Sequence, residues 1–137
     1  MLNERELRKQ AMLDANINRV GEGLRVIEDW ARFYLRDSSL MESVRELRHG
    51  LWGLVKEEYP QIIKGRSTGK DLLADALEGG RSSEEDIPRA SFNRVKEGLR
   101  VLEESGKIIS PEAGMNFKRM RFRIYDIEKD FYEKFTD

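Results

Sequence analysis

The chain has 137 residues, a length that fits a single domain in which roughly two thirds of the surface of the unfolded chain can be buried. Its 25 lysines and arginines balance 26 aspartates and glutamates, and this near-zero net charge argues against general binding to nucleic acid or to a membrane surface. It has no cysteine, one histidine and no apolar run of about 18 residues, which excludes disulfides, cysteine-ligated zinc, a multi-histidine metal site and a membrane-spanning helix.

Apolar residues spaced three and four apart predict four long helices and no strand. These helices are expected at about residues 4–35 (or from 13), 40–59, 83–109 and 111–135. The run from Asp37 to Ser39 should supply a break and an N-cap for the second helix, and Pro60 should end that helix. A connection rich in glycine, serine and charge covers about residues 60–83, with a short helix expected at 71–77.

An internal repeat is the strongest signal in the sequence. Residues 18–28 match residues 93–103 at nine of eleven positions, with an offset of 75. The second helices match more weakly, in Leu47 with Met120, Arg48 with Arg121, Leu51 with Ile124, Trp52 with Tyr125 and Tyr59 with Tyr132. We therefore expect one all-α domain, with repeat one at about 13–59 and repeat two at about 84–135. Two such hairpins predict a four-helix bundle with a pseudo-two-fold axis.

Apolar residues in a 4-3-4-3 spacing predict the core-facing seam of each repeat. In the first repeat these are Leu13, Ile17, Val20, Leu24, Ile27, Ala31 and Tyr34. In the second they are Phe92, Val95, Leu99, Leu102, Gly106 and Ile109. Other aromatic residues are expected to fill core or interface, or else to stack on a flat base, namely Trp30, Phe33, Trp52 and Tyr125. Gly23 and Gly98 lie inside helices, which indicates close packing of helices or close approach of a ligand.

Polar residues beside the seam repeat in the same order on the first and third helices. On the first helix they are Asn18, Arg25, Glu28 and Arg32, with Arg19 and Glu22 further round. On the third they are Asn93, Arg100, Glu103 and Lys107, with Arg94 and Glu97 further round. Ion pairs at this spacing are common on helix surfaces. Residues that keep their identity in two diverged copies nevertheless favour a ligand site.

The connection and the second helix offer weaker candidates. Residues 65–71 contain two cations, two hydroxyl groups and two glycines, which could cradle a phosphate or could belong to a solvated linker. The segment resembles a P-loop but fails its pattern, because Asp71 follows Lys70 and no strand precedes it. His49 is either a packed or surface residue or, since imidazole titrates near neutrality, a general acid or base.

Six ordered motifs lie at residues 14–19, 22–28, 47–49, 66–71, 93–104 and 120–121. In this order they resemble the small domain often found in front of thiamine-phosphate synthase, a family associated with a second type of hydroxymethylpyrimidine-phosphate kinase. The resemblance extends from about Asp14 to Tyr132. Ser67 and the pair Gly69 and Lys70 depart from the family pattern, which has an acid and Ala-Gly at these positions.

The resemblance implies transfer of the γ-phosphoryl group of ATP to 4-amino-5-hydroxymethyl-2-methylpyrimidine phosphate, giving the diphosphate in thiamine biosynthesis. Because the acceptor is anionic, catalysis would consist of charge neutralisation and alignment. The expected catalytic cations are Arg25, Arg66, Arg100 and Lys107. The expected substrate-binding residues are Asn18, Arg19, Glu22, Arg32, Arg48, His49, Thr68, Asn93, Arg94, Glu97 and Arg121. The candidate ligands of Mg²⁺ are Glu28, Asp71 and Glu103.

Other readings of the sequence stay open beside this one. The chief alternative is a non-catalytic oligomerisation or interaction domain that partners thiamine-phosphate synthase. A helix-turn-helix DNA-binding domain is disfavoured by the near-zero net charge. We expect small-molecule substrates, no nucleic-acid or membrane partner, a cytoplasmic location, and a homodimer as an open alternative to a monomer.

Overall fold

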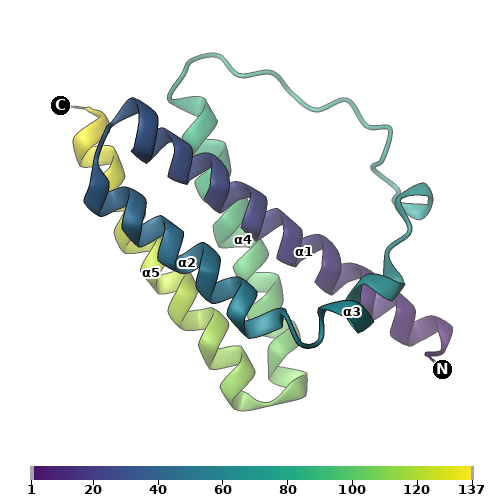
Figure 1. Ribbon diagram of the computed structural model, residues 1–137. Helices are drawn as coiled ribbons and strands as arrows, with labels where there is room; N and C mark the ends of the chain where they lie inside the picture. Colours follow the sequence, from purple (N-terminus) through teal and green to yellow (C-terminus); the bar gives the residue numbers. More distant parts are fainter. Residues whose placement is uncertain (1, 137) are drawn as a thin grey trace.

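The computed structural model describes residues 2–136, and this part of the chain is all-helical without a strand (Figure 1). The long helices are α1 (Glu4–Asp29), α2 (Ser38–Val55), α4 (Asp86–Ile109) and α5 (Pro111–Phe135). The short elements are a π-helical turn (Trp30–Tyr34), α3 (Tyr59–Ile62) and two 3₁₀ turns (Ile63–Gly65 and Thr68–Lys70). The prediction of an all-α fold is confirmed. Over the same residues, each helix is too short or too polar to cross a membrane.

The four long helices share one hydrophobic core. α1 packs against both α2 and α4, α4 packs along α5, and α2 also contacts α5 (Figure 1). The fully enclosed side chains come from all four helices and include Val20, Leu24, Ile27, Val44, Val95, Leu99, Ile124 and Phe131. The predicted seams are thus confirmed over most of their length. Each hairpin supplies one stripe of apolar residues that covers the stripe of the other.

The outer ends of both seams were predicted incorrectly. Tyr34 is 55% exposed and Ile109 is 73% exposed. Tyr34 is the last residue of the π-helical turn, whose wider winding displaces it from the line that α-helical spacing predicts. Ile109 is the last residue of α4, beyond the point where α5 covers it. The other four aromatic residues differ in burial. Trp30 packs against the core, whereas Phe33, Trp52 and Tyr125 are exposed.

Several predicted boundaries shift, each for a local reason. Pro60 does not end the second helix, since α2 already stops at Val55 and proline sits in the first turn of α3, where its missing N–H costs nothing. The helix expected at 71–77 is absent, and this stretch forms turns in the long connection (Figure 1). The third helix begins at Asp86 rather than near residue 83. The predicted cap is confirmed, because the side chain of Asp37 accepts the backbone N–H of Leu40 at 3.0 Å.

Two glycines allow α1 and α4 to pack closely. A Cβ atom built on Gly23 would lie 2.8 Å from Cγ2 of Val95, and one built on Gly98 would lie 2.6 Å from Cγ2 of Val20. Each glycine therefore receives the valine that lies three residues before the other glycine. Of the two explanations that the sequence left open for these glycines, the structure supports close packing of helices.

The fold generates a prediction about these glycines. Gly98→Ala should lower the free energy of unfolding by about 1–3 kcal/mol, because the buried and branched Val20 has no room to move aside. Gly50→Ala is the matched control: beyond its chain neighbours and the nearby backbone of its own helix, nothing lies within 4 Å of its added Cβ, so better helix propensity should raise stability by up to about 1 kcal/mol. Urea denaturation of both variants measures the difference, and equal stability of the two would contradict the close approach.

Candidate functional site

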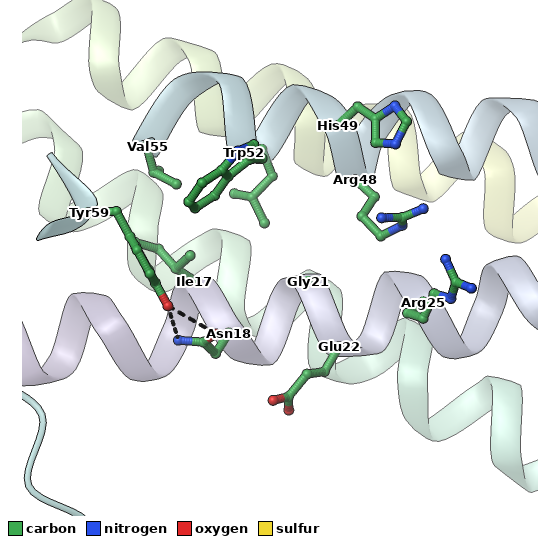
Figure 2. A pocket seen from close by; sticks show the side chains of 11 residues that line it. Ile17, Asn18, Gly21, Glu22, Arg25, Arg48, His49, Trp52, Val55 and Tyr59 are labelled. Atoms are coloured by element: carbon green, nitrogen blue, oxygen red, sulfur yellow. Dashed lines mark hydrogen bonds between the residues drawn. The ribbon is translucent and has the colours of Figure 1, made fainter. Parts of the chain in front are cut away.

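A groove of about 400 Å³ runs between α1 and α2, in the half of the molecule formed by the first repeat (Figure 2). Its lining consists of Ile17, Asn18, Gly21, Glu22, Arg25, Arg48, His49, Leu51, Trp52, Val55 and Tyr59. Asn18 and Tyr59 lie at one end, and Arg25 and Arg48 lie toward the other (Figure 2). The rings of Trp52 and Tyr59 meet edge to face with centroids 5.3 Å apart. We call this cavity the aromatic groove; it is apolar in the middle and polar at both ends.

A second cavity, of about 410 Å³, adjoins the cationic end of the aromatic groove. It is lined by Arg25, Glu28, Arg32, Met41, Arg45 and Arg48, and we call it the arginine pocket. Arg25 and Arg48 line both cavities, so one ligand or two adjacent ligands can contact both. Four guanidinium groups against one carboxylate leave an excess of positive charge. Guanidinium groups bind phosphate oxygens in pairs, so this pocket suits a phosphorylated ligand.

A buried carboxylate pairs with the shared arginines. Glu28 is only 3% exposed, and its two oxygens accept hydrogen bonds from Arg48, from Nε at 2.8 Å and from Nη2 at 3.3 Å. Arg25 approaches the same carboxylate to 3.5 Å. Burial alone would raise the pKa of Glu28, but the hydrogen bond and charge of Arg48, helped by Arg25 and Arg45, hold this pKa below its ordinary value. Glu28 therefore stays ionised and fixes the guanidinium group of Arg48 beside the groove, whereas the half-exposed Arg25 lies between Glu28 and Asp29, 3.5 Å and 3.6 Å away.

The second repeat contains the same buried glutamate with its arginine, an arrangement that we call the glutamate–arginine clamp in both repeats. Glu103 is also 3% exposed, and it accepts a hydrogen bond of 2.8 Å from Nε of Arg121, with Arg100 at 3.4 Å. The hydrogen bond from Arg121 lowers the pKa of Glu103 against the opposing effect of burial. Glu28 with Arg48 thus joins α1 to α2, and Glu103 with Arg121 joins α4 to α5. For these four residues, pairing of helices is sufficient reason for their identity in both repeats.

A polar network closes the far end of the aromatic groove. Arg66 donates to both oxygens of the buried Asp14 at 2.7 Å, and its Nη2 also donates to the hydroxyl of Tyr59 at 3.0 Å. Asn18 Nδ2 donates to Asp14 Oδ1 at 3.0 Å and to the same hydroxyl at 3.2 Å. The dashed lines in Figure 2 mark the contacts between Asn18 and Tyr59. Arg66 therefore ties the connection to α1, and the amide of Asn18 has a fixed orientation.

The structure brings together only part of the predicted site. The predicted residues that line the two cavities are Asn18, Glu22, Arg25, Glu28, Arg32, Arg48 and His49. Glu22 on α1 and His49 on α2 are both exposed (Figure 2). Arg19 lies against Gly98 of α4 and donates to Asn16 Oδ1 of its own helix at 2.7 Å, and its counterpart Arg94 lies against Gly23. The remaining predicted residues lie in the connection or in the second repeat, namely Arg66, Thr68, Asp71, Asn93, Glu97, Arg100, Glu103, Lys107 and Arg121.

Sequence reasoning missed some of the lining. Arg45 was not proposed, although it lies three residues before Arg48 and hence on the same face of α2. Trp52 was expected in core or interface, with stacking on a flat base as the alternative, and Val55 and Tyr59 were not weighed as binding residues. The spacing of Arg45, Arg48 and Trp52 along one helix face was the available signal for this wall of the site.

The three carboxylates predicted as magnesium ligands lie in separate places. Glu28 and Glu103 are held by arginines in different hairpins. Asp71 is exposed in the connection, where its side chain accepts the backbone N–H of Leu73. Over residues 2–136 there is no cluster of three or more acidic or histidine side chains suited to a metal ion. These residues do not form a shared magnesium site, and we assign no chemical step to a metal held by them.

The buried glutamate–arginine clamp of the second repeat should make the free energy of unfolding depend on pH. Because the folded pKa of Glu103 lies below its ordinary value of 4.5, the clamp stabilises the fold above that pH and is lost as pH falls through the folded pKa. Glu103→Gln should therefore lower the free energy of unfolding by about 1–3 kcal/mol at neutral pH. Urea denaturation across the acid range should show this difference shrinking below the ordinary pKa. The exposed Glu42→Gln serves as the control, and a difference independent of pH would contradict the ionised clamp.

Comparison with known proteins places the chain in a family. Residues 11–130 match the ThiD2 family. The chain is 41% identical over 120 residues to a thiamine-phosphate synthase of Nostoc sp. and 38% identical over 120 residues to one of Synechocystis sp.. These matches cover 85% of this chain and 33% and 34% of the two relatives, so the chain spans about a third of their length. No solved structure matches it. Since the match extends over most of its length, the chain belongs to the ThiD2 family.

Proposed function

We propose that this chain is a cytoplasmic phosphotransferase of thiamine biosynthesis. It would convert 4-amino-5-hydroxymethyl-2-methylpyrimidine phosphate and ATP into the pyrimidine diphosphate and ADP. The observation that carries the proposal is the union of the aromatic groove with the arginine pocket at Arg25 and Arg48. A flat heteroaromatic ring bearing a phosphate has the same division into an apolar and an anionic part. The names of the relatives support the pathway.

The aromatic groove would hold the pyrimidine ring. Trp52 offers an exposed indole face for contact with the ring, and Tyr59 bounds the end of the groove. The Nδ2 group of Asn18 already donates to Asp14 and Tyr59. Its Oδ1 atom accepts the hydroxyl of Tyr59 at 3.4 Å and has a second lone pair for a further hydrogen bond, which suits an exocyclic amino group of the ring. The network of Asp14 and Arg66 would act by positioning Asn18 and Tyr59.

The arginines would align the two phosphate-bearing substrates. Arg25 and Arg48 would bind the acceptor phosphate where the two cavities meet, and Arg32 and Arg45 would bind the phosphates of ATP. An oxygen of the acceptor phosphate attacks the γ-phosphorus, the bond from that phosphorus to the β-phosphate oxygen breaks, and ADP leaves. Cations lower the barrier by neutralising charge, and the ionised acceptor needs no general base. Mg²⁺ would enter with the phosphates of ATP, since magnesium is commonly held by substrate phosphates.

We also propose that the four long helices form a bundle with a pseudo-two-fold axis between α1 and α4. The reciprocal contacts of Gly23 with Val95 and of Gly98 with Val20 support this arrangement. So do the matching clamps of Glu28 with Arg48 and of Glu103 with Arg121. Superposition of the two hairpins in a crystal structure would test it.

The direct test is a phosphorus NMR assay of the purified chain with hydroxymethylpyrimidine phosphate, ATP and Mg²⁺. The pyrimidine diphosphate should form in step with ADP. Arg25→Ala should lower turnover at least about tenfold, because the half-exposed guanidinium contacts the acceptor phosphate and contributes little to the fold. Arg8→Ala, which removes an exposed arginine of the first turns of α1, is the control and should match the wild type. Absence of turnover by folded wild-type protein at high concentration would refute the kinase assignment.

A second candidate is a non-catalytic domain that partners thiamine-phosphate synthase. The observation that favours it is that the chain spans only about a third of relatives that carry this name. Thermal melting separates the two functions, because a ligand that binds only the folded state raises the melting temperature. A catalytic chain should melt several degrees higher in hydroxymethylpyrimidine phosphate at about a hundred times its Kd. Stabilisation by the synthase alone, with no response to the small molecule, would favour the partner role.

A further inference from the structure

The two hairpins retain the same glutamate and arginines at one end, but the corresponding space between their helices is filled differently. The offset of 75 relates α1 to α4, and the pairs Arg48 with Arg121 and Trp52 with Tyr125 relate α2 to α5 by 73. Under these offsets, the cationic end of the aromatic groove has identical counterparts in the second repeat. The apolar middle of the groove has no identical counterparts in the second repeat.

Three positions in the middle of the groove carry a larger side chain in the second repeat: Ile17 corresponds to Phe92, Gly21 to Lys96, and Val55 to Glu128. Elsewhere in the lining, His49 corresponds to the larger Phe122 and Trp52 to the smaller Tyr125. Phe92 is fully enclosed, whereas Gly21 contributes no side chain, and a Cβ added there would touch only Leu51, at 3.9 Å. The other apolar wall residue, Leu51, is replaced by an isoleucine of equal size. Apart from Trp52, whose counterpart is the smaller Tyr125, each change of size in the lining adds side-chain volume in the second repeat.

The lysine and the glutamate meet across the second hairpin. Nζ of Lys96 lies 3.0 Å and 3.1 Å from the two carboxylate oxygens of Glu128, and both side chains are largely buried. The same Nζ atom lies 5.7 Å from the ring centroid of Tyr125, the counterpart of Trp52. A charged pair thus bridges α4 and α5, and its cation lies near the ring of Tyr125, which is 42% exposed.

The polar end of the groove is also rebuilt. Tyr132, the counterpart of Tyr59, packs against the rings of Phe92 and Phe131 with centroids 5.9 Å and 5.8 Å away. Arg89 occupies the position of Asp14 and lies over the ring of Tyr132, at 6.0 Å from its centroid. The acid that fixes the amide end of the first groove is therefore a cation in the second repeat, where the tyrosine belongs to an aromatic cluster.

We propose that the chain holds one pyrimidine phosphate, in the first repeat, because Phe92, Lys96 and Glu128 close the equivalent groove of the second. Gly21 and Val55 are then the specificity-determining residues, since they keep the aromatic groove open. The second repeat serves to complete the core and retains its glutamate–arginine clamp for that purpose. This inference rests on the proposed function for the identity of the ligand, but not on the occurrence of catalysis.

Isothermal titration of the full chain with hydroxymethylpyrimidine phosphate provides the test. The wild type should bind one ligand per chain, and a stoichiometry of two would overturn the inference. Gly21→Lys combined with Val55→Glu transfers the closing ion pair into the first groove and should weaken binding at least about tenfold. Gly53→Lys combined with Leu54→Glu adds the same side chains at exposed positions outside the groove and should bind like the wild type.

Two further variants keep the test informative. Gly21→Leu fills the groove without a buried charge and should also weaken binding, so the conclusion does not depend on the folding of the double variant. Lys96→Gly combined with Glu128→Val should leave the affinity of the first groove within about twofold of the wild type. Lost affinity in that variant would place the ligand in the second repeat and overturn the inference. Binding without turnover would refute the kinase alone, whereas absence of binding to the wild type would refute both proposals.

Discussion

A buried carboxylate in each hairpin determines how its two helices can pair. Glu28 and Glu103 are nearly inaccessible to water, and an ionised carboxylate in such a place is tolerated only with a cation at hydrogen-bonding distance. Arg48 and Arg121 provide those cations from the neighbouring helix, which fixes the register of α2 on α1 and of α5 on α4. The walls of the aromatic groove and the direction of Arg25 depend on the first of these pairs.

The main features of the fold follow from the sequence because they depend on local chemistry. The apolar seams face the core, Asp37 caps α2, and Pro111 opens α5, each for a reason that a few neighbouring residues contain. The errors arise where tertiary packing decides. The π-helical turn that moves Tyr34 out of the seam has no sequence signal that we could use. Pro60 marks a helix start as well as it marks a helix end, and only the packing of α3 distinguishes the two.

The candidate site could be predicted only in part, because residues that are identical in the two repeats were taken to indicate a ligand site. Arg48 and Glu28 were found, but so were Arg121 and Glu103, which the same argument could not separate from them. Identity in both copies selects any role that both copies share, and pairing of helices is such a role. Identity between the copies therefore points to two sets of residues, of which the structure gathers one around the α1–α2 cavities.

The informative position was one of the two mismatches in the matched stretch. Gly21 and Lys96 break an otherwise nearly unbroken alignment, and they lie where one hairpin is open and the other is bridged by an ion pair. After a duplication, both copies must still form the common core, which holds the clamps and the seams constant. Only one copy needs to keep a ligand cavity, so the other can exchange space for packing and a salt bridge. In a fold of this kind, identities between the copies do not separate a binding role from a shared structural role, and differences such as Gly21 against Lys96 indicate which copy keeps the cavity.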